Sequence, residues 1–292
     1  MTPTSFRSPQ PDAPIGVFDS GIGGLSVLQA LRTALPAEDF VYLADSAHTP
    51  YGERSTEFIA QRTIAIGEHL RQTYGVKLLV VACNSATAAG VQALRKAHPG
   101  WPVVALEPAL KPAAQRTQTA HVGVLATRAT LSSAKYAALK QTVARDMPHI
   151  SSTEVACDGL AAAIEAAALS DNETVVATLL DAYLAALGPL GPDAGATDTV
   201  VLGCTHYPLV RHLIEERVGP GVTLIDAGVP VARQAARLLY ATGLLRDSGD
   251  SRQDTSAPSG SLNLLASGEV VTLQAAAQRW LDLASVTINR AC

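Results

Sequence analysis

One segment, Leu78-Leu79-Val80-Val81-Ala82-Cys83-Asn84-Ser85, has the pattern of a buried strand that ends in a cysteine and two polar side chains. A second segment, Val200-Val201-Leu202-Gly203-Cys204-Thr205-His206, follows the same plan later in the chain. Short apolar runs bounded by polar residues are typical of strands in a parallel sheet that is covered on both faces. The repeated plan suggests an internal duplication with one cysteine in each half.

Around these two segments, short β-rich runs alternate with longer stretches that have helical spacing, among them Thr56–Thr73 and Asp171–Leu187. This alternation predicts βαβ units and therefore an α/β fold with mainly parallel sheets flanked by helices. The expected strands are Ile15–Phe18, Phe40–Leu43, Leu78–Ala82, Val103–Leu106, Val122–Leu125, Thr199–Leu202 and Val222–Ile225, with Leu262–Ala266 as a late strand and Leu273–Leu283 as a final helix.

Small polar residues follow most of the expected strands. They include Asp19 and Ser20, Asp45, Asn84 and Ser85, Thr127, and Thr205 and His206. Ligands of parallel sheets bind at the carboxyl ends of the strands. The sequence therefore predicts a pocket for a small polar ligand, built from these strand ends.

The bulk composition narrows the class of protein. The chain has 292 residues, 48% of them hydrophobic and 16% charged, with a formal net charge of −4. Two ordinary domains fit this length, and the absence of a basic surplus argues against nucleic acid as a partner. No apolar run approaches the roughly 20 residues that cross a bilayer. We expect residues 1–14 to form a disordered tail and the four cysteines to be free thiols in a reducing, cytoplasmic compartment.

Two thiols at equivalent strand ends indicate acid/base chemistry. Inversion of a stereocentre by proton transfer needs one group to remove the α-hydrogen and another to deliver a proton to the opposite face. A strand-to-helix junction favours the thiolate form, so Cys83 and Cys204 are the candidates.

Other interpretations of these residues remain open. Cys204 and His206 could form the nucleophile and base of a hydrolase, which would leave Cys83 unused. Cys204, His206 and His212 could bind a metal, although they lack the spacing of known zinc sites. A two-domain protein that binds an amino acid would need neither thiol. The glycine-rich turn Asp19–Gly24 could hold a carboxylate or phosphate, or be a tight turn only. We expect no metal and no cofactor.

Several motifs together resemble bacterial glutamate racemases of the aspartate/glutamate racemase superfamily. The motifs are Asp19-Ser20-Gly21-Ile22-Gly23-Gly24-Leu25, Pro50-Tyr51-Gly52, Ala82-Cys83-Asn84-Ser85-Ala86, Glu107-Pro108 and Leu202-Gly203-Cys204-Thr205-His206-Tyr207-Pro208-Leu209. The resemblance implies cofactor-independent interconversion of L- and D-glutamate, which supplies D-glutamate for peptidoglycan, and it implies a homodimer. An aspartate racemase of the same superfamily is the close alternative.

The resemblance also assigns roles. Cys83 and Cys204 would be the two acid/base thiols, and Cys157 would be structural. The residues that would assist the thiols are Asp19, Asp45, Glu165 and His206. The residues that would contact the substrate are Asp19, Ser20, Tyr51, Gly52, Asn84, Ser85, Thr127, Thr205 and His206. The chain departs from the family pattern at Ser85, Ala126 and Asp158, none of which removes an acid/base group.

The expected domain organisation follows from the paired cysteine segments. Two similar α/β domains should enclose the active site in the cleft between them. We expect residues 15–106 and 221–292 to form the first domain and residues 107–220 the second. The Ser-, Asp- and Gly-rich stretch 246–261 should be a flexible surface loop in the first domain.

Overall fold

The computed structural model describes residues 9–170, 172–246, 260–281, 283 and 287–291. The larger of its two sheets has the strand order β10-β9-β2-β1-β3-β4, and every neighbouring pair is parallel. Its strands are β1 (Ile15–Asp19), β2 (Phe40–Ala44), β3 (Leu78–Val81), β4 (Val103–Ala105), β9 (Leu262–Ala266) and β10 (Ile288–Arg290).

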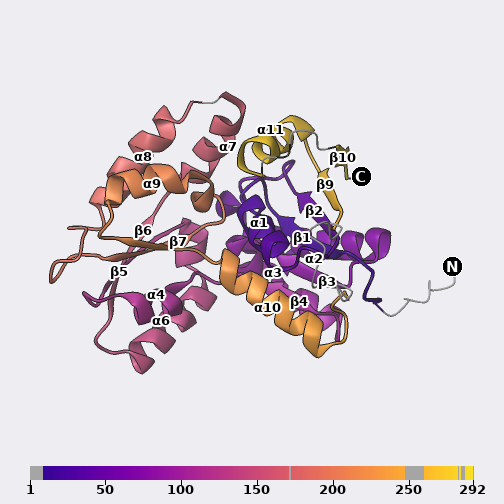
Figure 1. Cartoon of the computed structure of the whole chain (residues 1–292), viewed down its shortest axis with the longest axis horizontal. Helices are drawn as coiled ribbons and strands as arrows, with labels where there is room; N and C mark the ends of the chain where they lie inside the picture. Colours follow the sequence, from indigo (N-terminus) through magenta and orange to yellow (C-terminus); the bar gives the residue numbers. More distant parts are fainter. Residues whose placement is uncertain (1–8, 171, 247–259, 282, 284–286, 292) are drawn as a thin grey trace, which may run out of the picture.

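The smaller sheet has four strands in the order β6-β5-β7-β8, and it too is parallel throughout. Its strands are β5 (His121–Ala126), β6 (Ser151–Ala156), β7 (Thr199–Gly203) and β8 (Thr223–Ile225). The two sheets form separate halves of the molecule in Figure 1. This confirms the predicted fold class of two similar α/β domains.

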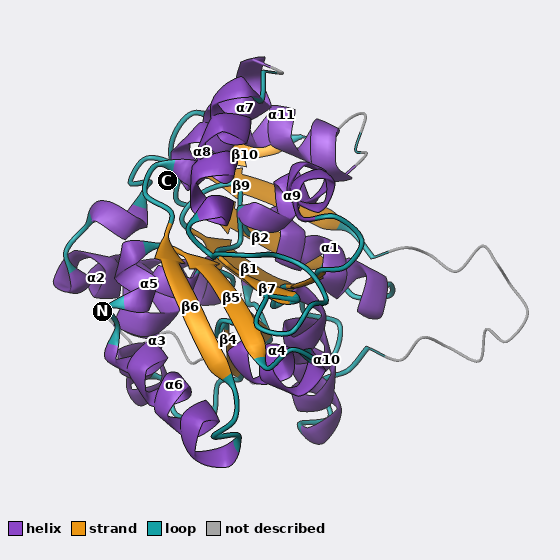
Figure 2. Cartoon of the chain, turned by 90° about the vertical axis from the view of Figure 1, so that its left-hand side faces the viewer, coloured by secondary structure: helices purple, strands orange, loops and turns teal. Residues whose placement is uncertain are grey.

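Helices cover both sheets, as Figures 1 and 2 show. The α-helices are α1 (Leu25–Ala34), α2 (Thr56–Tyr74), α3 (Asn84–Ala97), α4 (Leu110–Arg116), α5 (Arg128–Leu131), α6 (Ala134–Asp146), α7 (Leu160–Ser170), α8 (Thr174–Ala185), α9 (Arg211–Val218), α10 (Gly228–Ala241) and α11 (Val270–Leu281). Two short 3-10 helices are η1 (Tyr51–Glu53) and η2 (Tyr207–Val210). Among the helices of the described residues, none is long and apolar enough to span a bilayer.

The two sheets repeat one topology. The order β2-β1-β3-β4 in the larger sheet matches β6-β5-β7-β8 in the smaller one, strand for strand in chain order. The register is also matched, because Phe18 pairs with Val81, two residues before Cys83, and Leu125 pairs with Leu202, two residues before Cys204. Cys83 lies two residues after the end of β3, and Cys204 lies directly after the end of β7. The internal duplication suggested by the sequence thus extends to the arrangement of the strands.

The core continues from one domain to the other. The largest cluster of buried apolar side chains includes Val17 and Val80 from the larger sheet and Val200 and Leu202 from the smaller one. Helix α7 of the second half packs against α11 of the first, as Figure 1 shows. Burial of apolar surface is the main favourable term in folding, so this shared core stabilises the relative placement of the domains.

The structure corrects the predicted domain boundary. The sequence analysis assigned residues 221–292 to the first domain, but β8 pairs with β7 in the smaller sheet. The chain returns to the first half afterwards, where α10 packs against α1. The strand pairing shows that the chain crosses back to the first domain only after β8.

The N-terminal prediction was wrong for residues 9–14. Residues 10–13 form a turn, closed by a hydrogen bond from Ala13 N to Gln10 O, and the carbonyl oxygens of Pro11 and Pro14 accept hydrogen bonds from Lys77. Residues 1–8 lie outside the described part of the chain. So do residues 247–259, which make up most of the expected loop 246–261, and Cys292.

The sequence analysis did not predict two strands, β6 and β10, and both lie at sheet edges. The segment β6 has the sequence Ser-Ser-Thr-Glu-Val-Ala and is only half-buried, so it lacks the apolar run of a central strand. The segment β10 has three residues. The helix expected at Asp171–Leu187 runs from Thr174 to Ala185 in the structure.

Candidate active site

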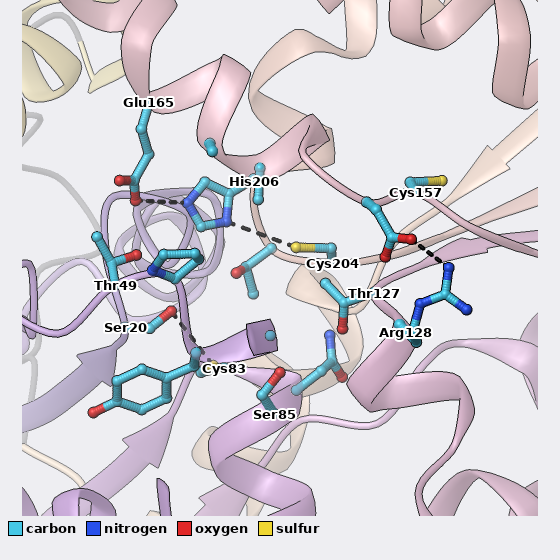
Figure 3. A pocket seen from close by; sticks show the side chains of 18 of the residues that line it. Ser20, Thr49, Cys83, Ser85, Thr127, Arg128, Cys157, Glu165, Cys204 and His206 are labelled. Atoms are coloured by element: carbon cyan, nitrogen blue, oxygen red, sulfur yellow. Dashed lines mark hydrogen bonds and ion pairs between the residues drawn. The ribbon is translucent and has the colours of Figure 1, made fainter. Parts of the chain in front are cut away.

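A cavity of about 380 Å³ lies between the domains and contains both candidate thiols. Cys83 follows β3 in the first domain and Cys204 follows β7 in the second, so each thiol comes from the same position of the repeated topology. Figure 3 shows the two side chains approaching the pocket from different segments, with Ser20 beside Cys83 and Thr127 beside Cys204. These hydroxyls also occupy equivalent positions, one residue after β1 and β5.

Most of the predicted site residues line this cavity. They are Ser20, Tyr51, Gly52, Cys83, Asn84, Ser85, Thr127, Glu165, Cys204, Thr205 and His206. The predicted residues Asp19 and Asp45 do not line it, although both are fully buried behind its wall. His212 is also absent from the lining and instead pairs with Glu173, at 3.1 Å.

The surroundings of Cys83 differ from those expected. Cys83 is the N-cap of α3, and its sulfur accepts a hydrogen bond from Ala86 N at 3.5 Å, as a strand-to-helix junction predicts. Its thiol faces Ser20 Oγ at 3.7 Å. However, burial and the nearby Asp19 carboxylate raise the pKa of Cys83. The expectation of a ready thiolate at Cys83 was therefore wrong, because burial outweighs the helix terminus.

Cys204 does not lie at a helix N-terminus. Its strand leads into Thr205, His206 and the short η2, and α9 begins only at Arg211. The sulfur of Cys204 instead lies 3.7 Å from Nδ1 of His206, whose Nε2 lies 3.0 Å from Oε1 of Glu165. Figure 3 shows these three side chains in one line.

This line of side chains favours the protonated, cationic form of His206. Burial alone lowers the pKa of His206, but the hydrogen bonds to Cys204 and Glu165 outweigh burial and hold the pKa well above its ordinary value. With both ring nitrogens protonated, His206 donates to Glu165 on one side and to Cys204 on the other. An imidazolium next to the sulfur stabilises negative charge that develops there.

The glycine-rich turn after β1 explains how Glu165 and His206 reach this position. A Cβ atom on Gly21 would overlap the Glu165 carboxylate, and one on Gly23 would overlap the His206 ring. Ile22 N donates to Oε1 of Glu165 at 3.3 Å. The sequence left two interpretations of this turn open, a site for a ligand or a tight turn only. In the structure the turn packs against side chains from the other domain of the same chain.

Asp19 is held by the same turn. Its Oδ2 accepts a hydrogen bond from Gly24 N at 2.7 Å, and its Oδ1 has no hydrogen-bond partner among the described residues. Burial raises the pKa of Asp19 to about 6, although the His206 cation opposes the rise. Asp19 can therefore change its charge state within the pH range in which enzymes ordinarily work.

Besides Cys157, sequence reasoning missed seven residues of the lining: Thr49, Pro50, Arg128, Asp158, Gly159, Ala161 and Ala162. Thr49, Pro50 and Arg128 follow expected strands, and that position is the signal that could have found them. The others follow β6, which the sequence analysis did not predict. Arg128 and Asp158 form an ion pair at the exposed rim, with side chains 69% and 56% exposed. Cys157, expected to be structural, also lines the cavity, and burial raises its pKa to about 12.

No group of three or more His, Cys, Asp or Glu side chains within the described residues is arranged to hold a metal ion. Cys204 and His206 raised the metal alternative. In the structure they form a row with Glu165, in which the His206 ring lies between the Cys204 sulfur and the Glu165 carboxylate. The described cysteines Cys83, Cys157 and Cys204 are free thiols.

A model of the Asp/Glu/Hydantoin racemase family matches residues 15–235. The glutamate racemase of Pseudomonas syringae pv. tomato is 48% identical over 245 residues, which cover 84% of this chain and 85% of that protein. This chain belongs to the Asp/Glu/Hydantoin racemase family. The resemblance stated from the motifs is thereby confirmed.

Solved structures of racemases in this family share the fold. A glutamate racemase isoform of Bacillus anthracis superimposes with a TM-score of 0.79 at 28% identity, covering 96% of this chain and 97% of that one. The Escherichia coli glutamate racemase, solved in complex with L-glutamate and the activator UDP-MurNAc-ala, gives a TM-score of 0.77 at 29% identity, covering 96% and 98%.

Two departures from the family pattern can be placed within this racemase-family site. Ser85 lines the cavity and keeps a hydroxyl group there. Ala126 ends β5 beside Gly203, where a Cβ atom on the glycine would lie only 2.9 Å from that of Ala126. The third departure, Asp158, forms the rim ion pair with Arg128.

Proposed function

We propose that this chain is a glutamate racemase that interconverts L- and D-glutamate by proton transfer between Cys83 and Cys204. The observation that carries the proposal is the entry of two thiols into one cavity from equivalent strand ends of two similar domains. A hydrolase or a simple binding protein has no use for this symmetry. The identity to glutamate racemases over most of the chain supports glutamate as the substrate.

In the proposed step, the Cys204 thiolate removes the α-hydrogen of L-glutamate while the Cys83 thiol delivers its proton to the opposite face of Cα. The product is D-glutamate, with Cys204 now a thiol and Cys83 a thiolate. The reverse reaction exchanges the roles. The raised pKa of Cys83 suits the donor role in the L-to-D direction, and the His206 cation suits the Cys204 thiolate that acts as the base in that direction.

The polar groups around the cavity are proposed to hold the substrate. Hydroxyl and amide groups come from both domains: Ser20, Asn84 and Ser85 from the first, Thr127 and Thr205 from the second. Asn84 Oδ1 is buried without a partner among the described residues, so a substrate ammonium could donate to it. Tyr51 and Gly52 complete the wall.

Three further parts of the proposal rest on the family. The D-glutamate would supply peptidoglycan synthesis, the enzyme would work in the cytoplasm, and it would form a homodimer. Sedimentation at micromolar concentrations tests the last point directly. A sedimentation coefficient that stays at the value of one 30.3 kDa chain would contradict the homodimer.

Circular dichroism of L-glutamate and L-aspartate with dialysed, chelator-treated protein tests the reaction and its substrate together. We expect the signal of glutamate to decay to zero and that of aspartate to persist. Decay of aspartate alone would favour the aspartate alternative. Activity that returns only on addition of zinc would contradict a reaction carried by the thiols alone.

The two-thiol mechanism predicts a specific isotope pattern. In deuterated water, early product should carry solvent deuterium at Cα while the remaining substrate keeps its hydrogen, because the two protons belong to different sulfurs. Replacement of either Cys83 or Cys204 by Ala should lower racemisation at least about 10²–10⁴-fold. Product that keeps the substrate's own hydrogen, or a Cys204→Ala variant that racemises well, would reject the mechanism.

A further inference from the structure

The buried carboxylate of Asp45 lies behind the pocket wall and is fully engaged by other side chains. Arg62, which lies on α2, binds it with two hydrogen bonds, Nε to Oδ2 at 2.9 Å and Nη2 to Oδ1 at 2.7 Å. The Tyr51 hydroxyl donates to Oδ2 at 2.6 Å, and His48 Nδ1 lies 3.0 Å from Oδ1. Both oxygens of Asp45 are therefore engaged by other side chains, and of these partners Tyr51 lines the substrate pocket.

This geometry gives Asp45 no direct access to a thiol. Burial raises the pKa of Asp45, but the hydrogen bonds from Arg62 and Tyr51 outweigh burial and lower it. The carboxylate is therefore always ionised in the working pH range and always an acceptor. Any influence of Asp45 on the reaction must pass through the groups that it holds.

The group that connects Asp45 to the pocket is Tyr51. Its side chain is 1% exposed, lines the cavity and packs with its ring centroid 6.3 Å from that of Phe18. Burial, Asp45 and Cys83 all raise the pKa of Tyr51, so its hydroxyl keeps its proton and donates it to Asp45. The hydrogen bond fixes the ring, and with it the backbone of Tyr51 and Gly52, both part of the wall.

We propose that Arg62 is a positioning residue for the racemisation reaction: its bidentate pair with Asp45 holds Tyr51 and the adjoining wall in place beside Cys83. The inference rests on the proposed function for the reaction that it serves. Arg62 suits this task because a guanidinium offers two parallel donors that match a carboxylate, whereas an ammonium is a single point charge.

A second possibility is that the pair only fastens α2 to the sheet. The two roles differ in what they change. A fastening role lowers the stability and leaves the kinetics of the folded enzyme unchanged. A positioning role weakens substrate binding at temperatures at which the variant is folded. It also makes the effects of substitutions at Arg62 and Tyr51 non-additive, because both residues act through Asp45.

The test compares Arg62→Ala, Arg62→Lys, Tyr51→Phe and the Arg62→Ala/Tyr51→Phe double variant with wild type. For Arg62→Ala we expect KM for glutamate to rise about tenfold in both directions, with kcat changed much less. Arg62→Lys should recover part of the loss because it keeps the charge. The double variant should be no worse than the poorer single variant. Arg71→Ala, on the same helix but paired with His98, is the matched control and should leave KM unchanged.

The pH profile supplies a readout that a fastening role does not move. The groups that face Asp45 are Arg62 from α2, Tyr51 from η1, His48 from its own loop and the hydroxyl of Ser267 after β9. Without Arg62 the pKa of Asp45 should rise, and the acid limb of kcat/KM should move to higher pH.

An unchanged KM and acid limb in folded Arg62→Ala would overturn the proposal, as would additive effects in the double variant. Wild type that does not racemise glutamate would refute the proposed function instead. If Arg62→Ala does not fold, Arg62→Lys decides by the same two readouts.

Discussion

Cys83 and Cys204 hold equivalent places in the fold but have unequal neighbours. The first thiol meets a hydroxyl and a backbone N–H, whereas the second meets the His206 and Glu165 pair. A two-base racemase needs one thiolate and one thiol at a time, and the two apparent pKa values belong to the pair. The unequal neighbours provide for that difference before the substrate arrives.

Asp19 offers a test of this charge distribution at the level of one residue. Because burial raises its pKa from 3.8 to about 6, the folded state binds more protons than the unfolded state between these values. Stability should therefore be lost as pH rises from 4 to 7, by about 2 kcal/mol from this group. Urea unfolding of Asp19→Asn should show that much less loss than wild type. Asp193→Asn, at an exposed carboxylate, should behave like wild type.

At the scale of elements, the larger sheet rests on a buried ion pair at its opposite end. Lys77, directly before β3, lies 2.5 Å from Glu38, close before β2, and the two side chains are 0% and 2% exposed. Arg246 N donates to Glu38 at 2.9 Å, so Glu38 also binds the end of the segment that follows α10. The starts of β2 and β3 and the N-terminal turn are thereby joined below the site.

Loss of one partner of this pair should be costly. Lys77→Met leaves a buried carboxylate without its cation and should lower the free energy of unfolding by about 3–5 kcal/mol. The Lys77→Met/Glu38→Leu variant, which removes both charges, should regain most of that stability. The exposed pair of Lys140 and Glu154 is the control, and Lys140→Met should cost less than about 1 kcal/mol. Urea titrations measure all three; equal losses at Lys77 and Lys140 would contradict the argument.

At the scale of the whole molecule, polar contacts cross between the domains directly around the pocket. Asn84 Nδ2 donates to Gly203 O at 3.0 Å, and Ser26 Oγ donates to Thr205 O at 2.9 Å. Ile22 N reaches Glu165 in the same way. Any change in the angle between the domains therefore changes the surroundings of both thiols.

Gly23→Ala tests this dependence without straining the backbone, because Gly23 is not among the glycines with positive φ. The added methyl group would overlap the His206 ring and lie 2.6 Å from Oγ1 of Thr205. Since a displacement of about 1 Å can cost roughly 10²-fold in rate, we expect kcat/KM to fall by that order while the thermal midpoint changes by only a few degrees. Wild-type kinetics in this variant would show that the domains can shift freely.

The sequence by itself determined the elements that local pattern controls. Apolar runs such as Leu78–Val81 predict central strands because both faces of a parallel sheet are buried. The polar residues after these runs predict a pocket at the strand ends. The same pattern placed Ser20, Cys83, Thr127 and Cys204 at one site. It did not detect β6, whose half-exposed position at a sheet edge requires no apolar run.

Only the tertiary structure decided how charges and domains meet. The crossing of β8 into the second sheet depends on strand pairing, which no local pattern records. The raised pKa of Cys83 depends on burial by distant segments, which outweighs the helix terminus visible in the sequence. Arg62 gave no signal, because it lies inside a helix and acquires its partner Asp45 only when α2 packs on the sheet. Long-range contacts, and not residue order, determine these properties.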